Sequence, residues 1–572
     1  MTEFKYSIAS SLAESIATLY PAATIAKEEI IGMLEYPPDD TMGDLAFPCF
    51  KLSRALRAAP PKIAATIFEH ISNNLPSCVE KAQIVGGYIN FFASTEFFTK
   101  NILSCVAAKG ADFGRTDKGL GKTVVLDYSS PNVAKPFHIG HLGTTVIGHS
   151  LKLLHEYQGY SCVGINHLGD WGTQFGKLIV AYRKWGSRED IENGGIDKLV
   201  ELYVKFHEEA EKDPALADEA RAEFTKLEHH DEENLALWRW FIDISLAEYK
   251  TTYDQLGITF DSYNGESFYT DKMPEQVQIL KDKNLMKIDD GASIVDLSEY
   301  NMPPCLILKR DGSTLYPTRD IAAAVYRKNE YKFDKAIYVT AAQQSLHFAQ
   351  WFKVVELMGY EWHDELVHVP YGTVSVNGMK LATRTGNVVL LKDLFAEAIE
   401  RVAEITKEKH PDPKECLEIA EKVGVGAVVF YYLSNNRMRD INFMMEDALS
   451  FEGNTGPYVQ YTYARTCSVL EKADIKGEMT AAELSDVEFE LAKCISVFPE
   501  RINNALNDYE PSIVTRYILD LAAAFNRFYH ECKIVGCEDA ELKSSRIALT
   551  GATNQVLRTA LHLICMQSPD KI

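Results

Sequence analysis

Residues 123–142 read TVVLDYSSPNVAKPFHIGHL. The apolar run that begins at Thr123 is typical of a buried strand, and the Ser-Ser-Pro-Asn segment after it is typical of a loop. Helical spacing of apolar residues starts near His141 and continues to about Tyr157. Strand–loop–helix units build parallel sheets, whose ligands bind at the carboxyl ends of the strands. This stretch therefore predicts an α/β domain with a parallel sheet.

The same alternation continues on the carboxyl side of this stretch. Strand-like segments follow at SCVGIN (161–166), KAIYVT (335–340) and VHVPYGTVSV (367–376). An acidic, helix-permissive segment at about 185–260 lies between the two halves of the pattern. We interpret that segment as a helical insertion into the sheet domain.

The two ends of the chain differ from its middle. The N-terminal part combines amphipathic helical stretches with a β-like segment at 86–93, and a Gly-rich, charged linker follows at 110–123. From about residue 395 onward, helical periodicity dominates. We therefore predict a multidomain α/β plus all-α protein with three parts: a small α+β domain at 1–115, the parallel-sheet domain at 116–394 with its insertion at about 185–260, and an all-α domain at 395–572.

The composition is that of an ordinary globular protein. Of 572 residues, 46% are apolar and 24% are charged, which excludes a disordered or fibrous chain. The net charge of −22, from 59 basic and 81 acidic residues, speaks against indiscriminate nucleic-acid binding. A specific RNA partner held on a local patch remains compatible with it.

The cysteines and the apolar runs of the sequence indicate in which cellular compartment the protein is expected. Eleven cysteines without a Cys-x-x-Cys spacing argue against a disulfide framework and a zinc ribbon, so we expect no structural metal. We find no apolar run of membrane-spanning length and no secretory signal. We therefore expect a cytoplasmic protein without a membrane partner.

The tetrapeptide His-Ile-Gly-His at 138–141 stands at the start of the predicted helix. Gly140 has no Cβ and would let a nucleotide approach the backbone. The imidazoles of His138 and His141 can donate to phosphoryl oxygens, and a helix N-terminus favours anions. Taken alone, a His-x-x-His pair could equally pack in a core or bind a metal. The preceding strand, the loop and Lys135 favour a phosphate site.

These residues resemble the His-Ile-Gly-His signature of class I aminoacyl-tRNA synthetases. With the flanking DYSSPNVAKP they resemble the arginyl-tRNA synthetase family in particular. Four more segments are similar to motifs of that family, in the same order: INHLGDWGTQFGKL (165–178), LYPTRDIAAA (315–324), QQSLHFAQ (343–350) and FEGNTGPYVQYTYAR (451–465). The resemblance extends from the N-terminal region nearly to Ile572.

The resemblance implies a Rossmann-type catalytic domain, a tRNA-contacting N-terminal domain and an all-α anticodon-binding domain. It implies an arginine–tRNA ligase that uses ATP with Mg²⁺ to form arginyl-adenylate and pyrophosphate. The enzyme would then transfer arginine to the 3′-terminal adenosine of its tRNA. Lys135, His138 and His141 would be catalytic, and His138, Gly140 and His141 would bind ATP. Because relatives are mostly monomers, we expect a monomer.

Arginine as a substrate is compatible with the residue types present. A guanidinium group is best bound by carboxylates in bidentate geometry. In the family, positions matching Asp127, Tyr316 and Asp320 grip the arginine side chain, and those matching Ser130, Asn132 and Gln344 contact its α-groups. Without the resemblance, Asp320 could be a helix N-terminal charge and Tyr316 a core residue.

Two departures from the family pattern stand out. Class I enzymes usually carry a Lys-Met-Ser-Lys-Ser loop, and the corresponding segment here is NGMKLATRTGNVV (377–389). Lys380 aligns with the first lysine and is expected to be catalytic and to bind ATP together with Thr383 and Arg384. Thr383 stands in place of the second lysine. In the family, a lysine just before the His-Ile-Gly-His motif usually compensates for that loss, and Lys135 occupies this position. Gly143 stands where the family commonly has arginine.

For the RNA, the predicted C-terminal domain offers Tyr458, Tyr461 and Arg465, which share one face of a helix. Two rings and a cation on one face suit splayed single-stranded bases. An aromatic stripe at this spacing is more often core, but it matches the anticodon-loop residues of the family. Tyr88–Phe92 resembles a segment that contacts the tRNA elbow in relatives, although these aromatic side chains could equally be strand core.

Two other classes of protein are compatible with parts of this pattern. Small nucleotidyltransferases share the His-x-Gly-His phosphate site, but they are usually much shorter than 572 residues and lack an all-α RNA domain. A non-catalytic paralogue would be expected to have lost Lys135, His138 or His141, and this sequence retains all three.

Overall fold

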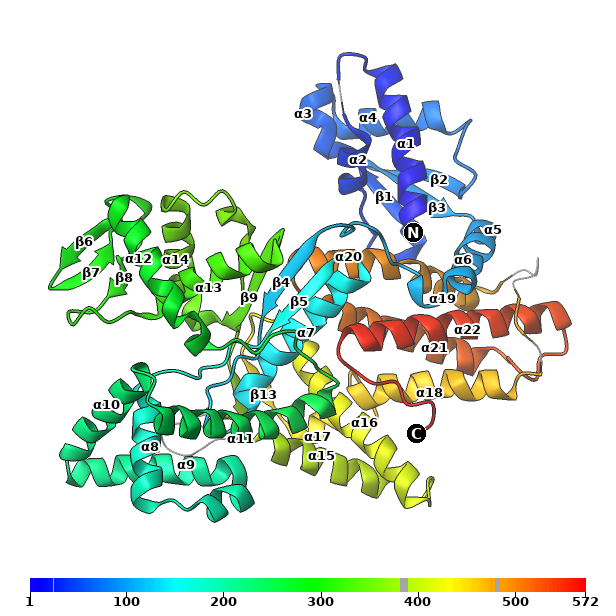
Figure 1. The fold of residues 1–572 in the computed structure, drawn as a ribbon. Helices are drawn as coiled ribbons and strands as arrows, with labels where there is room; N and C mark the ends of the chain where they lie inside the picture. The colour runs from blue at the N-terminus through cyan, green and yellow to red at the C-terminus, as the bar shows by residue number, and fades with distance from the viewer. Residues whose placement is uncertain (24, 381–388, 475, 479–483) are drawn as a thin grey trace.

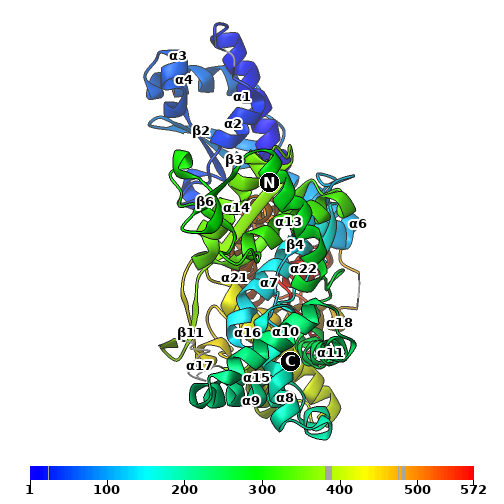
Figure 2. The ribbon, with the colours of Figure 1, turned by 60° about the vertical axis from the view of Figure 1, so that its left-hand side comes forward.

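The computed structural model describes residues 1–572 apart from 24, 381–388, 475 and 479–483. Four parts are visible in Figure 1: an N-terminal domain, a central domain built on a parallel sheet, a helical insertion beside it, and a C-terminal group of helices. In both Figure 1 and Figure 2, the N-terminal domain and the insertion lie at opposite ends of the molecule. None of the described helices is long and apolar enough to cross a membrane.

The central sheet has four parallel strands in the order β10-β9-β4-β5. They are β4 (Thr123–Asp127), β5 (Ser161–Ile165), β9 (Lys335–Ala341) and β10 (Leu366–Tyr371). Val124, Val125 and Leu126 are at most 1% exposed, so both faces of β4 are covered, as the continuous apolar run predicts. The helices of this domain are α7 (Leu142–Tyr157), α12 (Met273–Asp282), α13 (Tyr316–Tyr331) and α14 (Ser345–Leu357).

A small antiparallel sheet, absent from the sequence predictions, lies between α12 and α13 in the chain. Its strands are β6 (Met286–Asp289), β7 (Ala292–Val295) and β8 (Cys305–Leu308), in the order β6-β7-β8. Each strand has four residues, which is too short for a clear alternation of apolar and polar side chains.

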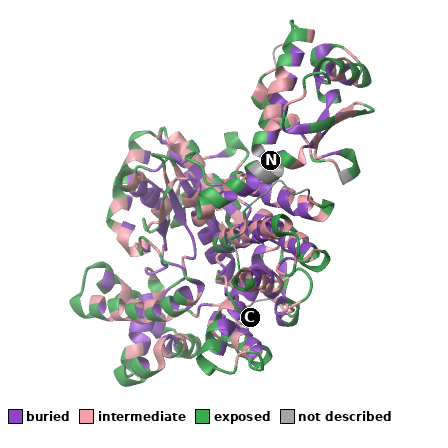
Figure 3. Ribbon diagram, turned by 90° about the vertical axis from the view of Figure 1, so that its right-hand side faces the viewer, coloured by how far each residue is buried: buried purple, intermediate pink, exposed green. Residues whose placement is uncertain are grey.

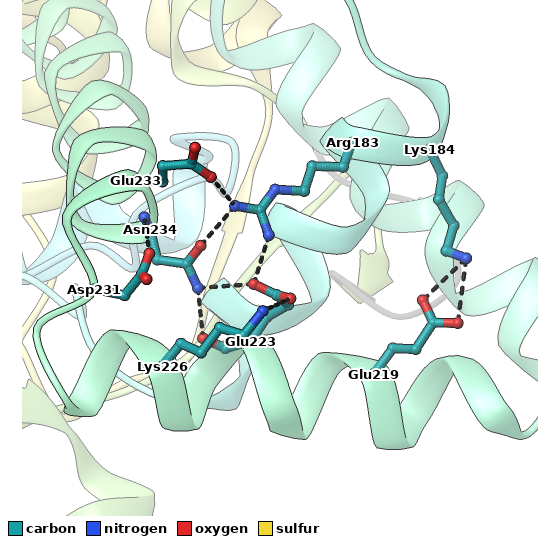
Figure 4. Close-up of polar contacts among 8 residues, drawn as sticks. All are labelled: Arg183, Lys184, Glu219, Glu223, Lys226, Asp231, Glu233 and Asn234. Atoms are coloured by element: carbon teal, nitrogen blue, oxygen red, sulfur yellow. Dashed lines mark hydrogen bonds and ion pairs between the residues drawn. The ribbon is translucent and has the colours of Figure 1, made fainter.

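The insertion consists of α8 (Thr173–Trp185), α9 (Arg188–Lys212), α10 (Ala215–Glu228) and α11 (Glu232–Leu256). A polar cluster around the fully buried Asn234 joins three of these helices (Figure 4). Asn234 Nδ2 donates to the carbonyl oxygen of Glu223 (2.8 Å) and to its Oε2 (2.9 Å), and Arg183 Nη2 donates to Asn234 Oδ1 (2.9 Å). The acidic residues of this segment are therefore partly used to hold its own helices together.

The N-terminal domain has a three-stranded antiparallel sheet in the order β1-β3-β2. Its elements are α1 (Thr2–Leu19), α2 (Lys27–Met33), β1 (Leu45–Pro48), α3 (Ser53–Leu56), α4 (Pro60–Ile71), β2 (Val79–Val85) and β3 (Tyr88–Ala93). The short helices α5 (Thr95–Phe97) and α6 (Ser104–Lys109) follow. Within β3, Phe91 is 1% exposed and belongs to the core, whereas Phe92 is only half-buried.

The C-terminal part is helical: α15 (Leu391–Thr406), α16 (Pro413–Leu433), α17 (Met445–Ala448), α18 (Gly456–Lys472), α19 (Asp486–Ser496), α20 (Phe498–Asp508), α21 (Ser512–Glu531) and α22 (Ala540–Leu563). Between it and the central sheet, β11 (Val374–Val376) pairs with β12 (Met379–Lys380) and β13 (Ile441–Phe443). Figure 3 shows the buried residues of these helices on their inward sides. The predicted fold class is confirmed, while the domain boundaries at 115 and 394 stay predictions.

Candidate active site

A cavity of about 510 Å³ opens at the carboxyl ends of β4 and β9. The six residues to which the family resemblance assigned arginine binding all line it: Asp127, Ser130, Asn132, Tyr316, Asp320 and Gln344. His141 also lines it, from the turn that precedes α7. The structure therefore brings together segments that are more than 200 residues apart in the chain.

The loop after β4 is held in an unusual conformation by other segments. Ser129, Ser130 and Ala134 have φ angles of 71°, 47° and 58°, a region that residues other than glycine seldom adopt. Val133 N donates to the carbonyl oxygen of Gly169 (3.1 Å), and a Cβ on Gly169 would lie 2.1 Å from Asn132 Oδ1. Glycine is thus required where the HLGDWG segment meets this loop.

Asp127 ends β4 and forms an ion pair with an arginine of the chain itself. Its Oδ2 lies 2.8 Å from Arg327 Nη1, and the Arg327 side chain is 1% exposed. Ser130 Oγ donates to the other oxygen, Oδ1, at 2.9 Å. Both oxygens of Asp127 are therefore engaged before any substrate binds.

Two further carboxylates line the cavity. Asp320 Oδ2 accepts a hydrogen bond from His347 Nε2 at 2.6 Å. Glu266 Oε2 lies 2.7 Å from Arg319 Nη1, and burial raises the pKa of Glu266 to about 7. Together with Asp127 they make an acidic wall suited to a guanidinium group.

Sequence reasoning missed Glu266, Arg327 and His347, all of which line the cavity. For Arg327 a signal was available, because Tyr316, Asp320 and Arg327 recur at helical spacing and share the cavity-facing side of α13. Glu266 lies in a short 3₁₀ helix (Glu266–Lys272) without such a pattern.

The two histidines of the His-Ile-Gly-His turn are held as neutral hydrogen-bond donors. Gly140 N donates to His138 Nδ1 (3.1 Å), and His138 N donates to His141 Nδ1 (3.2 Å). Because each Nδ1 accepts, each neutral ring carries its proton on Nε2. Burial lowers the pKa of His138 to about 4 and that of His141 to about 3. The centroids of the two rings are 4.0 Å apart, so the two Nε2–H groups lie in the same part of the site.

The remaining residues of the predicted ATP site are placed as follows. Lys135 lines a separate narrow hollow with Gln174 and Tyr203 rather than the large cavity. The backbone of Lys380 ends β12. Thr383 and Arg384 lie outside the described residues.

Comparison with known proteins supports the same assignment along the whole chain. The model of the class I tRNA synthetase (R) catalytic domain matches residues 104–445. The arginyl tRNA synthetase N-terminal domain matches residues 5–93, and the DALR anticodon binding domain matches residues 459–572. The arginine–tRNA ligases of Alkaliphilus metalliredigens and Clostridioides difficile are each 50% identical to this chain, and each alignment covers 100% of both sequences.

The chain belongs to the arginine–tRNA ligase family. The arginyl-tRNA synthetases of Thermus thermophilus and Plasmodium falciparum share its fold, with TM-scores of 0.82 and 0.81 at 24% identity. Each comparison covers 99% of this chain, and 99% and 98% of the other chains respectively. The resemblance to the arginyl-tRNA synthetase family is confirmed.

Within this family member, the unusual Gly143 has a packing reason. A Cβ at Gly143 would lie 2.2 Å from Tyr432 Oη of α16 and 3.0 Å from the ring of Tyr371. The first turn of α7 therefore packs directly against the C-terminal helices. An arginine could not occupy this position unless Tyr432 moved.

The three residues predicted to contact tRNA do lie together on α18. The guanidinium carbon of Arg465 is 5.1 Å from the ring centroid of Tyr461 and 4.9 Å from that of Tyr529. Asn526 Nδ2 donates to Tyr458 Oη at 3.0 Å. We call Tyr458, Tyr461 and Arg465 the α18 face; all three are half-buried.

Proposed function

We propose that this chain joins L-arginine to its tRNA in two steps. The arginine carboxylate attacks the α-phosphorus of ATP to form arginyl-adenylate and pyrophosphate. A ribose hydroxyl of the 3′-terminal adenosine of the tRNA then attacks the activated carbonyl and releases AMP. The observation that carries this proposal is the cavity in which Asp127, Glu266 and Asp320 line one wall, with His141 in the same lining.

Two groups of residues would bind the arginine substrate. Asp320, Glu266 and Tyr316 are placed to meet the guanidinium group, because their side chains line the cavity from α13 and the neighbouring turn. Ser130, Asn132 and Gln344 would contact the α-amino and carboxylate groups. Asp127 would add negative charge to the wall, although Arg327 already neutralises it locally.

The phosphoryl-transfer step would depend on positioning and charge neutralisation. The Nε2–H groups of His138 and His141 would donate to phosphate oxygens, with Gly140 against the nucleotide. ATP would enter as its Mg²⁺ complex, in which the ion neutralises phosphate charge. Among the described residues there is no cluster of three or more His, Cys, Asp or Glu side chains suited to hold a metal of its own. Lys135 and Lys380 would supply cations to the departing pyrophosphate, and Thr383 and Arg384 would complete the ATP site.

The tRNA would be read by the α18 face and supported by the N-terminal domain. Two tyrosine rings and a guanidinium group are the side-chain types that stack with unpaired bases. The net charge of −22 makes a local contact of this kind necessary, because the chain as a whole repels phosphate. We further propose that the protein acts as a monomer in the cytoplasm.

An ATP–pyrophosphate exchange assay with L-arginine tests this function. In this family activation typically needs bound tRNA, so we expect exchange only when tRNA for arginine is added. Lysine in place of arginine should give no exchange, because its compact ammonium does not match paired carboxylates. Absence of arginine-dependent exchange in the presence of tRNA would refute the proposal.

A further inference from the structure

The three carboxylates of the cavity differ in what holds them. Asp127 and Glu266 are paired with Arg327 and Arg319, whose guanidinium groups stay charged at all working pH values. Asp320 is paired instead with His347, and an imidazole, unlike a guanidinium, has a neutral form that still donates a hydrogen bond. Among the described residues, His347 is the only ion-pair or hydrogen-bond partner of the Asp320 side chain.

The exposed fraction of the side chains also distinguishes Asp320 from the other two carboxylates. The side chains of Asp320 and His347 are 27% and 28% exposed, whereas Asp127 and Arg327 are 12% and 1% exposed. Glu266 and Arg319 are also well covered, at 16% and 12%. Asp320 is therefore the carboxylate that an incoming cation reaches most easily, and its partner is the one that can lose its charge.

We propose that His347 occupies the guanidinium subsite on Asp320 in the arginine-free protein and gives way to the substrate. The inference deepens the proposed function, because it depends on arginine entering this cavity. Two cations beside one carboxylate repel each other, so arginine binds Asp320 only as a protonated His347 gives up its proton. The proton passes from the imidazolium to buffer, and the guanidinium of arginine takes over the carboxylate. His347 is thus a positioning residue that holds the empty subsite.

The surroundings of His347 define which other groups could contribute to a pH dependence. Asp320 faces it from α13, and His368 lies on β10, where its ring stacks 4.3 Å from the ring of Phe348, the neighbour of His347 on α14. Burial, then Arg437 and His347, lower the pKa of His368 to about 4, so that ring stays neutral. Burial raises the pKa of Glu266, which also lines the cavity, to about 7, so the experiment has to separate the proton of Glu266 from that of His347.

Calorimetric titration of the full-length protein with L-arginine, with tRNA present, measures the proton directly. Titrations between pH 5.5 and 8 in two buffers of different ionisation enthalpy give the Kd and the number of protons released. For the unsubstituted protein we expect proton release at acidic pH and a Kd that rises by up to about tenfold per pH unit as the pH falls. Binding of arginine without proton release at any of these pH values would overturn the inference.

Substitutions assign the proton to one group. His347→Gln and His347→Asn should both bind arginine and lose this release, whereas Glu266→Gln should retain it. His363→Gln serves as the matched control, since His363 lies 4.0 Å from Glu356, outside the cavity lining, and its removal should leave the release unchanged. A release that persists in both His347 variants and disappears in Glu266→Gln would overturn the inference while leaving arginine binding, and so the proposed function, intact. Failure of the unsubstituted protein to bind arginine would instead refute the proposed function itself.

Discussion

At the scale of single residues, two aspartates in one cavity have different partners. Asp127 is bound on both oxygens by Arg327 and Ser130, and Asp320 is bound on one oxygen by His347. A carboxylate with a permanent, buried guanidinium partner contributes less free charge to a ligand than one with a replaceable imidazole. The negative charge that the cavity offers a ligand therefore depends on the residues paired with each aspartate as much as on the aspartates themselves.

Replacement of Arg327 by methionine tests how Asp127 is held. The substitution removes one partner of a buried ion pair and leaves Asp127 uncompensated, so we expect a loss of about 3–5 kcal/mol in the free energy of unfolding. Urea denaturation followed by tryptophan fluorescence measures it.

Arg310→Met is the control for Arg327→Met. Arg310 pairs with Asp290 at the surface, where the two side chains are 69% and 85% exposed, and the expected loss is below about 1 kcal/mol. Equal losses of unfolding free energy in the two variants would show that the Arg327–Asp127 pair stabilises the protein no more than a surface ion pair does.

Lys135→Ala should abolish adenylate formation. A phosphate-directed cation in a water-poor site is comparable to an oxyanion-hole donor, whose loss costs about 100-fold or more in rate. ATP–pyrophosphate exchange with saturating tRNA measures the effect. Lys122→Ala, an exposed lysine just before β4, should leave exchange unchanged. Near-normal exchange by Lys135→Ala would refute the idea that this lysine compensates for Thr383.

At the scale of elements, helices bring the chemistry together by presenting one face. On α13, Tyr316, Asp320 and Arg327 all reach the cavity, and on α18, Tyr461 and Arg465 stack at 5.1 Å. On α11, Asn234 occupies the centre of the insertion cluster. The same periodicity thus gives α13 a face that lines the cavity, α18 a face of stacked side chains, and α11 a residue for internal packing.

Tyr461→Ala tests the α18 face. If the ring stacks on an unpaired base, tRNA affinity should fall by about 1–3 kcal/mol, or about 5- to 150-fold. Filter binding with tRNA for arginine measures it. Tyr300→Ala removes another tyrosine, 40% exposed, beside the small antiparallel sheet, and should not change the affinity. Unchanged binding by Tyr461→Ala would identify the α18 face as core packing alone.

Asn234→Ala tests the insertion cluster. The change removes the hydrogen bonds that the buried Asn234 makes with Arg183 and with the carbonyl and carboxylate of Glu223, at a cost of about 1–3 kcal/mol to local stability. Hydrogen exchange of the α10 amides should accelerate accordingly. Glu233→Ala, whose side chain is 86% exposed, should have little effect although it also contacts Arg183. Unaltered exchange in Asn234→Ala would show that apolar packing alone holds α10.

At the scale of the whole molecule, the N-terminal domain is attached to the C-terminal helices by polar contacts. Glu500 of α20 binds Lys5 (2.7 Å) and Tyr36 (2.6 Å), and Lys493 of α19 binds Asp44 (2.9 Å). The two ends of the chain therefore meet, and both would act on one tRNA as a connected surface.

Glu500→Ala should loosen this attachment. It removes the shared partner of Lys5, whose side chain is 12% exposed, and of Tyr36, which is 37% exposed, so the contact should weaken by about 1–3 kcal/mol. Trypsin cleavage in the linker at 110–123 should become faster. Glu531→Ala, which removes only an exposed pair with Arg527, should leave the cleavage rate unchanged. Equal rates in Glu500→Ala and the unsubstituted protein would refute the role of Glu500.

Short-range patterns in the sequence were enough to predict the parallel sheet and the helical C-terminal part, and the resemblance to the arginyl-tRNA synthetase family implied the residues that line one cavity. Strand and helix periodicity are local, and the His-Ile-Gly-His turn and its neighbours are contiguous motifs. The small sheet β6–β8 was not predicted, because strands of four residues are too short to show a clear alternation of apolar and polar side chains.

Which acids are already neutralised was decided by tertiary structure alone. Asp127 meets Arg327 across 200 residues of sequence, and Glu266 meets Arg319 across 53. Ion pairing depends on the distance between side chains in space, and no periodicity along the chain reports it. The sequence by itself therefore determined what kind of site this is, and the packing of β4, α13 and α14 determined which of its charges remain for the substrate.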